Sequence, residues 1–168
     1  MSVEVLNGLR GGSLDAGFYN EAGDPDADLS TVDVASFSIY LAAPPGLLAA
    51  SEPLDWAVMS ELPWICPAAG ACCGQAAENL FEKHQIRPKR ITTIDRESVT
   101  RTLIAGGVGI GLLHADTAED ARDKGEVVLV CKAQEVVRVL FAHRADRAKD
   151  PLLSSVTSIL RTGGTVSR

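Results

Sequence analysis

The chain has 168 residues, of which 46% are hydrophobic and 23% are charged, and this composition excludes intrinsic disorder for most of its length. Its 16 Lys and Arg residues against 22 Asp and Glu residues give a net charge of −6, and aromatic residues make up only 5%. An acidic chain with few aromatic rings neither attracts a phosphate backbone nor stacks bases. These numbers therefore argue against nucleic-acid binding by the chain alone.

The first part of the chain predicts one helix and two strands. The helix starts at the capping residue Ser2 and stops at the Gly11-Gly12 pair, because glycine ends helices readily. Two segments have the composition of strands, residues 14–19 and 32–43, and the second alternates apolar with polar residues. The break at Pro44-Pro45-Gly46 predicts a hinge or a boundary between lobes.

Strands and helices then alternate along the rest of the chain. Helices are predicted over residues 55–61, 72–84, 96–104, 117–124 and 152–160, and strands over 64–66, 90–94, 108–113, 127–130 and 136–142. This alternation predicts an α/β fold with a mainly parallel sheet covered by helices.

The glycine-rich segment at residues 106–111 is not a nucleotide-binding loop. Its glycines follow a predicted helix and precede a predicted strand, which is the opposite order to a dinucleotide-binding motif. We interpret it as a helix end that runs into a tightly packed strand. A P-loop, a nucleophile elbow and a pair of catalytic carboxylates are all missing from the sequence, so no catalytic residue is predicted.

The cysteines and histidines give weaker signals. Cys66, Cys72, Cys73 and His84 lack a C-x-x-C pair, so neither a metal site nor a cofactor is predicted, and reduced thiols are expected. Cys72 and Cys73 begin a predicted helix, where the dipole favours a thiolate, but we interpret them as small residues of a tight loop. His84 and His143 are expected on the surface, and so is the basic cluster around Lys83, Arg87 and Lys89.

The order of elements itself predicts a binding site. In doubly wound sheets, ligands bind beyond the carboxyl ends of the strands, and a helix that begins there offers free N–H groups to a carboxylate. The residues at that edge are Pro67, Ala68, Ala69, Gly70, Ala71 and Cys72 after one strand, Thr93, Ile94 and Asp95 after the next, and His114 at the end of a third.

Four segments resemble one known family. Residues 9–18, LRGGSLDAGF, are similar to the L-x-x-G-x-L-D-L-A-I stretch of the effector-binding domain of LysR-type transcriptional regulators. Residues 40–46 (YLAAPPG), 62–65 (LPWI) and 103–114 (LIAGGVGIGLLH) resemble three further segments of that domain, in the same order and spacing. The one departure in the last segment is His114, which stands where the family has proline.

The resemblance implies a type 2 periplasmic-binding-protein-like fold, in which two lobes of mostly parallel sheets covered by helices enclose a small effector. The first lobe would comprise residues 1–44 and 139–168 and the second lobe residues 45–138, with hinge strands over 39–43 and 139–143. The family has further elements before the segment that matches Ser2, so the resemblance implies an N-terminally truncated domain with an incomplete first lobe.

The function implied is that of a regulatory domain that senses a small, anionic organic molecule in the cytoplasm and catalyses nothing. DNA would be contacted only through a helix-turn-helix domain that this chain lacks, and no segment is apolar enough for a membrane span. A homo-oligomer is expected, because the incomplete first lobe would expose Leu14, Ala16 and Phe18. The alternative is a free-standing solute-binding protein of the same fold, against which the missing signal sequence counts.

Overall fold

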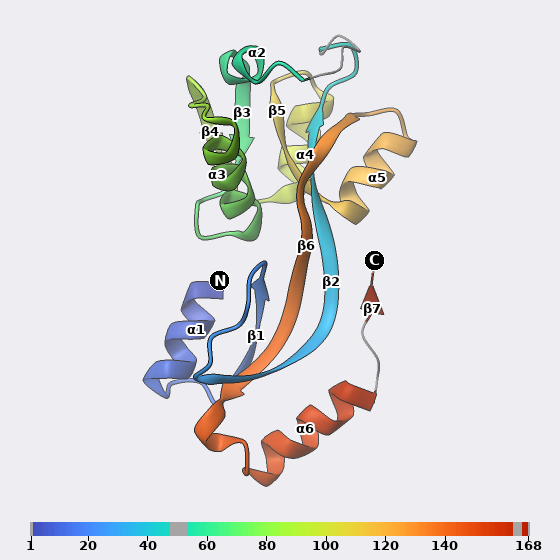
Figure 1. Ribbon diagram of the computed structural model, residues 1–168. Helices are drawn as coiled ribbons and strands as arrows, with labels where there is room; N and C mark the ends of the chain where they lie inside the picture. The colour runs from blue at the N-terminus through green and yellow to red at the C-terminus, as the bar shows by residue number, and fades with distance from the viewer. Residues whose placement is uncertain (1, 48–53, 163–165, 168) are drawn as a thin grey trace. The chain divides into compact units, whose positions relative to one another are not determined.

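The computed structural model describes residues 2–47, 54–162 and 166–167 (Figure 1). The chain forms two compact units: unit 1 comprises Met1–Phe37 and Val136–Arg168, and unit 2 comprises Ser38–Glu135. Two long strands, β2 (Leu29–Ala43) and β6 (Val128–Arg144), are hydrogen-bonded neighbours, and each contributes residues to both units.

Besides the parts of β2 and β6 that belong to it, unit 1 contains several shorter elements. They are α1 (Ser2–Gly11), β1 (Ala16–Glu21), a 3₁₀ turn (Ala145–Arg147), α6 (Pro151–Thr162) and β7 (Val166–Ser167). Strand β1 pairs antiparallel with β6, from Ala16 opposite His143 to Glu21 opposite Arg138. The core of unit 1 joins α1 to these strands through Leu9, Tyr19, Leu29, Leu140 and Ala142.

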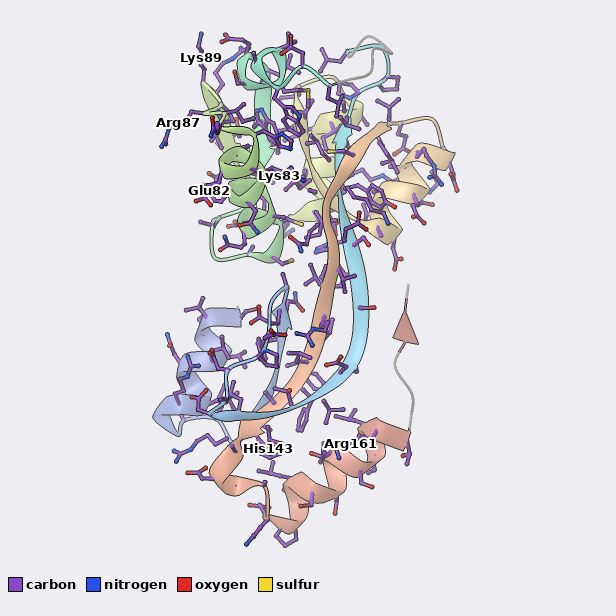
Figure 2. All side chains as sticks on the ribbon, viewed as in Figure 1. Glu82, Lys83, Arg87, Lys89, His143 and Arg161 are labelled. Atoms are coloured by element: carbon purple, nitrogen blue, oxygen red, sulfur yellow. The ribbon has the colours of Figure 1, made fainter. Side chains whose placement is uncertain are left out.

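His143 corrects one expectation, because it is buried rather than on the surface. Only 3% of this residue is exposed, and its Nδ1 lies 2.9 Å from the carbonyl oxygen of Arg144 (Figure 2). The residue belongs to the last buried stretch of β6, where it pairs with Ala16. Its ring also packs edge-on against Phe141, at 6.4 Å between centroids, so it serves as a core residue of unit 1.

Unit 2 is an α/β arrangement with strand order β2-β5-β3-β4. Its further elements are α2 (Trp56–Glu61), β3 (Pro63–Cys66), α3 (Cys72–His84), β4 (Arg90–Thr93), α4 (Glu97–Ala105), β5 (Ile110–His114) and α5 (Ala115–Asp123). Strand β3 lies parallel to both β4 and β5, whereas β2 runs antiparallel to β5. The sheet is therefore mixed, with its parallel part where strands and helices alternate in the sequence.

The core of unit 2 lies between its sheet and helices α4 and α5. It is formed by Ala42, Ile65, Ile104, Leu113, Ala118, Ala121 and Val127. On β3, the fully buried Trp64 donates its indole N–H to the carbonyl oxygen of Met59 at 2.9 Å, and Phe81 of α3 packs edge-on against its ring. This indole hydrogen bond fastens α2 to β3.

The glycine-rich segment behaves as a helix end followed by a packed strand. Gly107 closes α4 in the left-handed conformation, with φ of 79°, and its N–H donates to the carbonyl oxygen of Ile104 at 2.9 Å. A Cβ on Gly109 would lie 2.3 Å from the carbonyl oxygen of Pro63, so only glycine lets the chain enter β5 this close to β3.

The prediction of two strands over 127–130 and 136–142 is wrong, because β6 is continuous from Val128 to Arg144. The polar segment from Lys132 to Glu135 lies between the two predicted strands. In the structure it stays extended, and the Ser38 hydroxyl donates a hydrogen bond to the carbonyl oxygen of Glu135.

Among the residues that the structure describes, none of the helices combines the length and the apolar character needed to cross a membrane.

Candidate functional site

Three parallel strands of unit 2 end at the same edge of the sheet, and each is followed there by a helix. Strand β3 leads through residues 67–71 into α3, β4 leads through residues 94–96 into α4, and β5 leads directly into α5. Parallel strands have their carboxyl ends at one edge, so this topology brings the starts of three helices together. The residues predicted to bind a ligand lie on these connections or at the strand and helix ends that border them.

The loop between β3 and α3 is held close to the first turn of the helix. A Cβ on Gly74 would lie 2.2 Å from the carbonyl oxygen of Ala68, so the loop touches the helix backbone where a larger residue would stand. The N–H of Ala71 donates to the same carbonyl oxygen at 2.9 Å, and the Asp95 carboxylate accepts from the N–H of Ala68 at 3.4 Å. These contacts fix the shape of a loop whose residues 68–71 are exposed.

Ile94 has a structural role at this edge, whereas Thr93 is exposed. The N–H of Ile94 donates to the carbonyl oxygen of Cys66 at 2.9 Å, and its side chain packs against the core of unit 2. Thr93 and Asp95 leave their side chains on the surface beside it. Some of the predicted residues, such as Ile94, therefore have a structural role through their backbone, whereas others, such as Thr93 and Asp95, offer exposed polar side chains.

Two adjacent cysteines at the start of α3 contact the histidine at the end of β5. The Cys72 Sγ lies 3.2 Å from His114 Nε2, and the Cys73 Sγ lies 3.7 Å from the same nitrogen. Cys73 is buried, while Cys72 and His114 are half-buried. The interpretation of the two cysteines as small residues of a loop does not explain these contacts, since both sulfur atoms lie close to one imidazole nitrogen.

Glu97 orients His114 and is a site residue that sequence reasoning missed. Its Oε2 lies 2.8 Å from His114 Nδ1, and its Oε1 accepts the backbone N–H of His114 at 2.6 Å. Glu97 is the first residue of α4, where the helix dipole stabilises a carboxylate. The signal for it was the topology, because a helix that follows β4 begins at the edge where β5 ends.

The cluster shifts the pKa values of its groups in opposite directions. A hydrogen bond donated by the Cys73 thiol lowers the pKa of Cys72 to about 4, with help from the His114 imidazole and against the effect of burial. The same hydrogen bond raises the pKa of Cys73, and burial raises it further. Hydrogen bonds to Cys72 and Glu97 raise the pKa of His114 to about 10 despite burial.

Glu97 completes the charge pattern. Burial acts to raise the pKa of its carboxyl group, but the hydrogen bonds and charge of His114 outweigh burial and lower it overall. At neutral pH the cluster is therefore a thiolate, an imidazolium and a carboxylate in a row. Chemically, this arrangement can hold a nucleophilic sulfur or, once protons are lost, coordinate a metal ion.

Other surface features of unit 2 lie away from this edge. One groove of about 700 Å³ is lined by Phe81, Gln85, Ile86, Pro88 and neighbouring residues at the far end of α3. Near that end, Arg87 and Lys89 point away from the ribbon (Figure 2), and both side chains are exposed, as is Lys83. Lys89 forms an exposed ion pair with Glu61 at 2.8 Å, so this cluster behaves as the solvated face that the sequence predicts.

Comparison with known proteins identifies the family. A family model described as the LysR substrate binding domain matches residues 1–164. The CcmR regulatory domain of Synechocystis PCC6803, solved in complex with 2-PG, has a TM-score of 0.72 at 17% identity, over 96% of this chain and 79% of that one. The MetR regulatory domain of N. meningitidis has a TM-score of 0.69 at 18% identity, over 94% and 73% of the two chains.

A third similar structure is full-length LysG from Corynebacterium glutamicum with bound effector Arg, with a TM-score of 0.66 at 18% identity, over 95% of this chain and 55% of that one. No curated protein sequence matches the chain. At these identities the likeness to solved structures concerns the fold. The alternative of a free-standing solute-binding protein is not favoured, because the family model that matches residues 1–164 is that of the LysR substrate binding domain.

The family match covers nearly the whole chain, and it confirms the predicted type 2 periplasmic-binding-protein-like fold. The chain belongs to the LysR substrate binding domain family, the effector-binding regulatory domains of LysR-type transcriptional regulators.

Proposed function

We propose that this domain senses a small organic anion at the edge of unit 2 where β3, β4 and β5 end. The observation that carries the proposal is the match of residues 1–164 to the LysR substrate binding domain, together with the position of the predicted site residues on these connections. Two of the structural neighbours are solved with small molecules, 2-PG in CcmR and Arg in LysG.

The start of α3 supports the choice of an anion. Its N-cap residue, Ala71, makes no side-chain hydrogen bond to the first turn, since a methyl group cannot accept one. The N–H groups of that turn and the helix dipole thus favour a carboxylate or phosphate oxygen supplied by a ligand. The loop side chains can affect the shape of the site but cannot form hydrogen bonds, because they are the methyl groups of Ala68, Ala69 and Ala71. Specificity for a ligand would therefore depend on backbone groups and on Thr93, Asp95 and His114.

A ligand screen with a matched pair of glycine variants tests this proposal. Small carboxylates and phosphate esters are added to the purified chain in the presence of a chelator, and binding is read as a rise in melting temperature and then by calorimetry. Gly74→Ala should weaken binding at least tenfold, because its Cβ would lie 2.2 Å from the Ala68 carbonyl oxygen and displace the loop.

Gly11→Ala in unit 1 is the control, since a Cβ there meets nothing within 4 Å and binding should not change. Circular dichroism establishes that both variants are folded. Equal affinity in the Gly74→Ala variant, or no response to any anion in the screen, would contradict the proposal.

The partners and location follow from the same proposal. A regulator of this family acts on DNA through a helix-turn-helix domain, and we infer that this domain works in the cytoplasm as part of a homo-oligomer. Cell fractionation checks the location, and a chain recovered outside the cytoplasm would revive the solute-binding alternative.

A further inference from the structure

Three potential metal ligands converge at the edge of unit 2. The Sγ atoms of Cys72 and Cys73 and the Nε2 atom of His114 all lie within 4.8 Å of one another. Consecutive residues of a helix point about 100° apart, because a turn contains about 3.6 residues. Cys72 and Cys73 are the first two residues of α3, and the residue before them, Ala71, has an extended backbone. Although neighbouring side chains of a helix diverge, both sulfur atoms lie close to the same imidazole nitrogen, at 3.2 and 3.7 Å.

These distances have the dimensions of a tetrahedral metal site. With metal–sulfur bonds of about 2.3 Å and metal–nitrogen bonds of about 2.0 Å, tetrahedral angles place sulfur and nitrogen ligands about 3.5 Å apart. The two sulfur–nitrogen distances of 3.2 and 3.7 Å lie on either side of that value. A metal ion would therefore require shifts of a few tenths of an ångström, as rotation about χ1 of a cysteine provides.

The fourth residue of the cluster prepares His114 for this role. Glu97 accepts hydrogen bonds from both Nδ1 and the backbone N–H of His114, at 2.8 and 2.6 Å. With Nδ1 thus protonated, Nε2 is the nitrogen directed at the sulfur atoms. Metal-binding histidines almost always donate their other ring N–H to a carboxylate or carbonyl group, which fixes the ring and strengthens it as a ligand.

We propose that Cys72, Cys73 and His114 bind a divalent cation of the zinc class, with Glu97 as a positioning residue. Two thiolates and one imidazole suit zinc rather than magnesium or calcium, which prefer oxygen ligands. Cys72 is already a thiolate, so on binding the proton of the Cys73 thiol and the proton of His114 Nε2 pass to solvent, and the metal takes their place. Three protein ligands leave one coordination position for water or for a donor atom of another molecule.

This site goes beyond the proposed sensing of an organic anion and does not depend on it. The metal is tested alone, without any organic ligand, whereas the anion is tested with a chelator present. Either proposal can therefore fail while the other stands.

The experiment uses the purified, reduced chain after treatment with a chelator, titrated anaerobically with Co²⁺. We expect one equivalent to give the visible bands of tetrahedral cobalt together with a thiolate-to-cobalt charge-transfer band, and Zn²⁺ to abolish both by displacement. Cys72→Ser, Cys73→Ser and His114→Ala should each lose or shift these bands. Cys131→Ser and His84→Ala are matched controls from the same unit and should keep them.

Glu97→Gln separates positioning from ligation. It should retain the tetrahedral spectrum while binding Zn²⁺ about 10–100-fold more weakly, as removal of a carboxylate behind a ligating histidine does. Because a ligand variant could fail to fold, the melting temperature provides a second readout. Zn²⁺ should raise it in the unaltered chain and in Cys131→Ser, and not in Cys72→Ser.

Three outcomes would overturn the proposal. One is the lack of a saturable cobalt spectrum, another is an octahedral spectrum, and the third is a tetrahedral spectrum that survives in both cysteine variants. A cluster that consumes hydroperoxide but gives no cobalt spectrum would be a thiol redox site instead, and it would equally exclude the metal.

Discussion

Three cysteines close together in the sequence have different chemistry because each lies in a different environment. Burial raises the pKa of the Cys66 thiol to about 12, and a hydrogen bond to a neighbouring sulfur raises that of Cys73. Cys72 receives that hydrogen bond and lies beside the His114 imidazole, which lowers its pKa to about 4. Neither thiol reactivity nor ligand character at these residues follows from residue type alone.

At neutral pH we expect iodoacetamide to alkylate Cys72 first when a chelator keeps metals away. A lowered pKa means that the thiolate is present above about pH 4 and is lost only as the pH falls through that value. Labelling of Cys72 should thus persist at pH 5.5, where Cys131, whose pKa burial raises, remains unlabelled. Mass spectrometry of the labelled peptides measures both, and loss of Cys72 labelling between pH 8 and pH 7 would contradict the expected charge state.

At the scale of single elements, α2 shows how a short helix depends on its cap. Asp55 accepts hydrogen bonds from the N–H groups of Ala57 and Val58, at 2.9 and 3.3 Å, and α2 has only six residues. A helix this short cannot persist by its own hydrogen bonds, so the cap and the packing of Met59 hold it in place.

Asp55→Ala should lower the free energy of unfolding by about 1 kcal/mol, the usual cost of removing an N-cap side chain. Asp55→Asn retains an acceptor oxygen and should lose much less. Urea denaturation followed by circular dichroism compares the two variants. An equal loss in both would mean that the charge of Asp55, rather than its hydrogen bonds, stabilises the helix.

The sequence predicted most helices and the common edge of the strands, because apolar spacing and breaker residues are local signals. The bounds of α3 agree with the prediction at both ends. The continuity of β6 was missed, since the segment around Lys132 and Glu135 is polar and its strand partner, β2, is distant in the sequence. Glu97 was missed for the same reason, since its partner His114 is a tertiary contact that no spacing in the sequence records.

At the scale of the whole molecule, unit 1 has an exposed aromatic side chain on the strand at the end of its strand order. Strand β1 is the terminal strand beside β6, and Phe18 on it is 54% exposed although it packs against Phe141. Leu14 just before β1 is 40% exposed, as expected, whereas Ala16, which was also expected to be uncovered, is half-buried. Among the described residues no strand pairs with the outer edge of β1, and such an edge with exposed apolar side chains favours contact with another chain.

We therefore expect a dimer or larger species at micromolar concentration. Phe18→Ser should shift the population toward monomer, whereas Val58→Ser, which alters an equally exposed residue of α2, should not. Light scattering coupled to size exclusion measures the mass of each variant. A stable monomer with a cooperative melt would remove the reason for expecting association.

The same chain should show no sequence-specific binding to DNA on its own. Its net charge of −6 repels the phosphate backbone, and this repulsion is strongest at low salt. A mobility-shift assay at low ionic strength checks this, with a basic DNA-binding protein as the positive control. A retarded band that a specific competitor alone removes would contradict the expectation.

The passage of the chain through β2 and β6 has a consequence for biosynthesis. Unit 2 is one unbroken stretch, and its two ends are joined by the hydrogen bond from the Ser38 hydroxyl to the Glu135 carbonyl oxygen. A ribosome that has released residue 135 has supplied everything unit 2 needs to fold, while unit 1 still lacks its C-terminal half. Unit 2, which carries the cysteine cluster, can thus fold first, whereas β1 must wait for its pairing partners, residues 138–143 of β6.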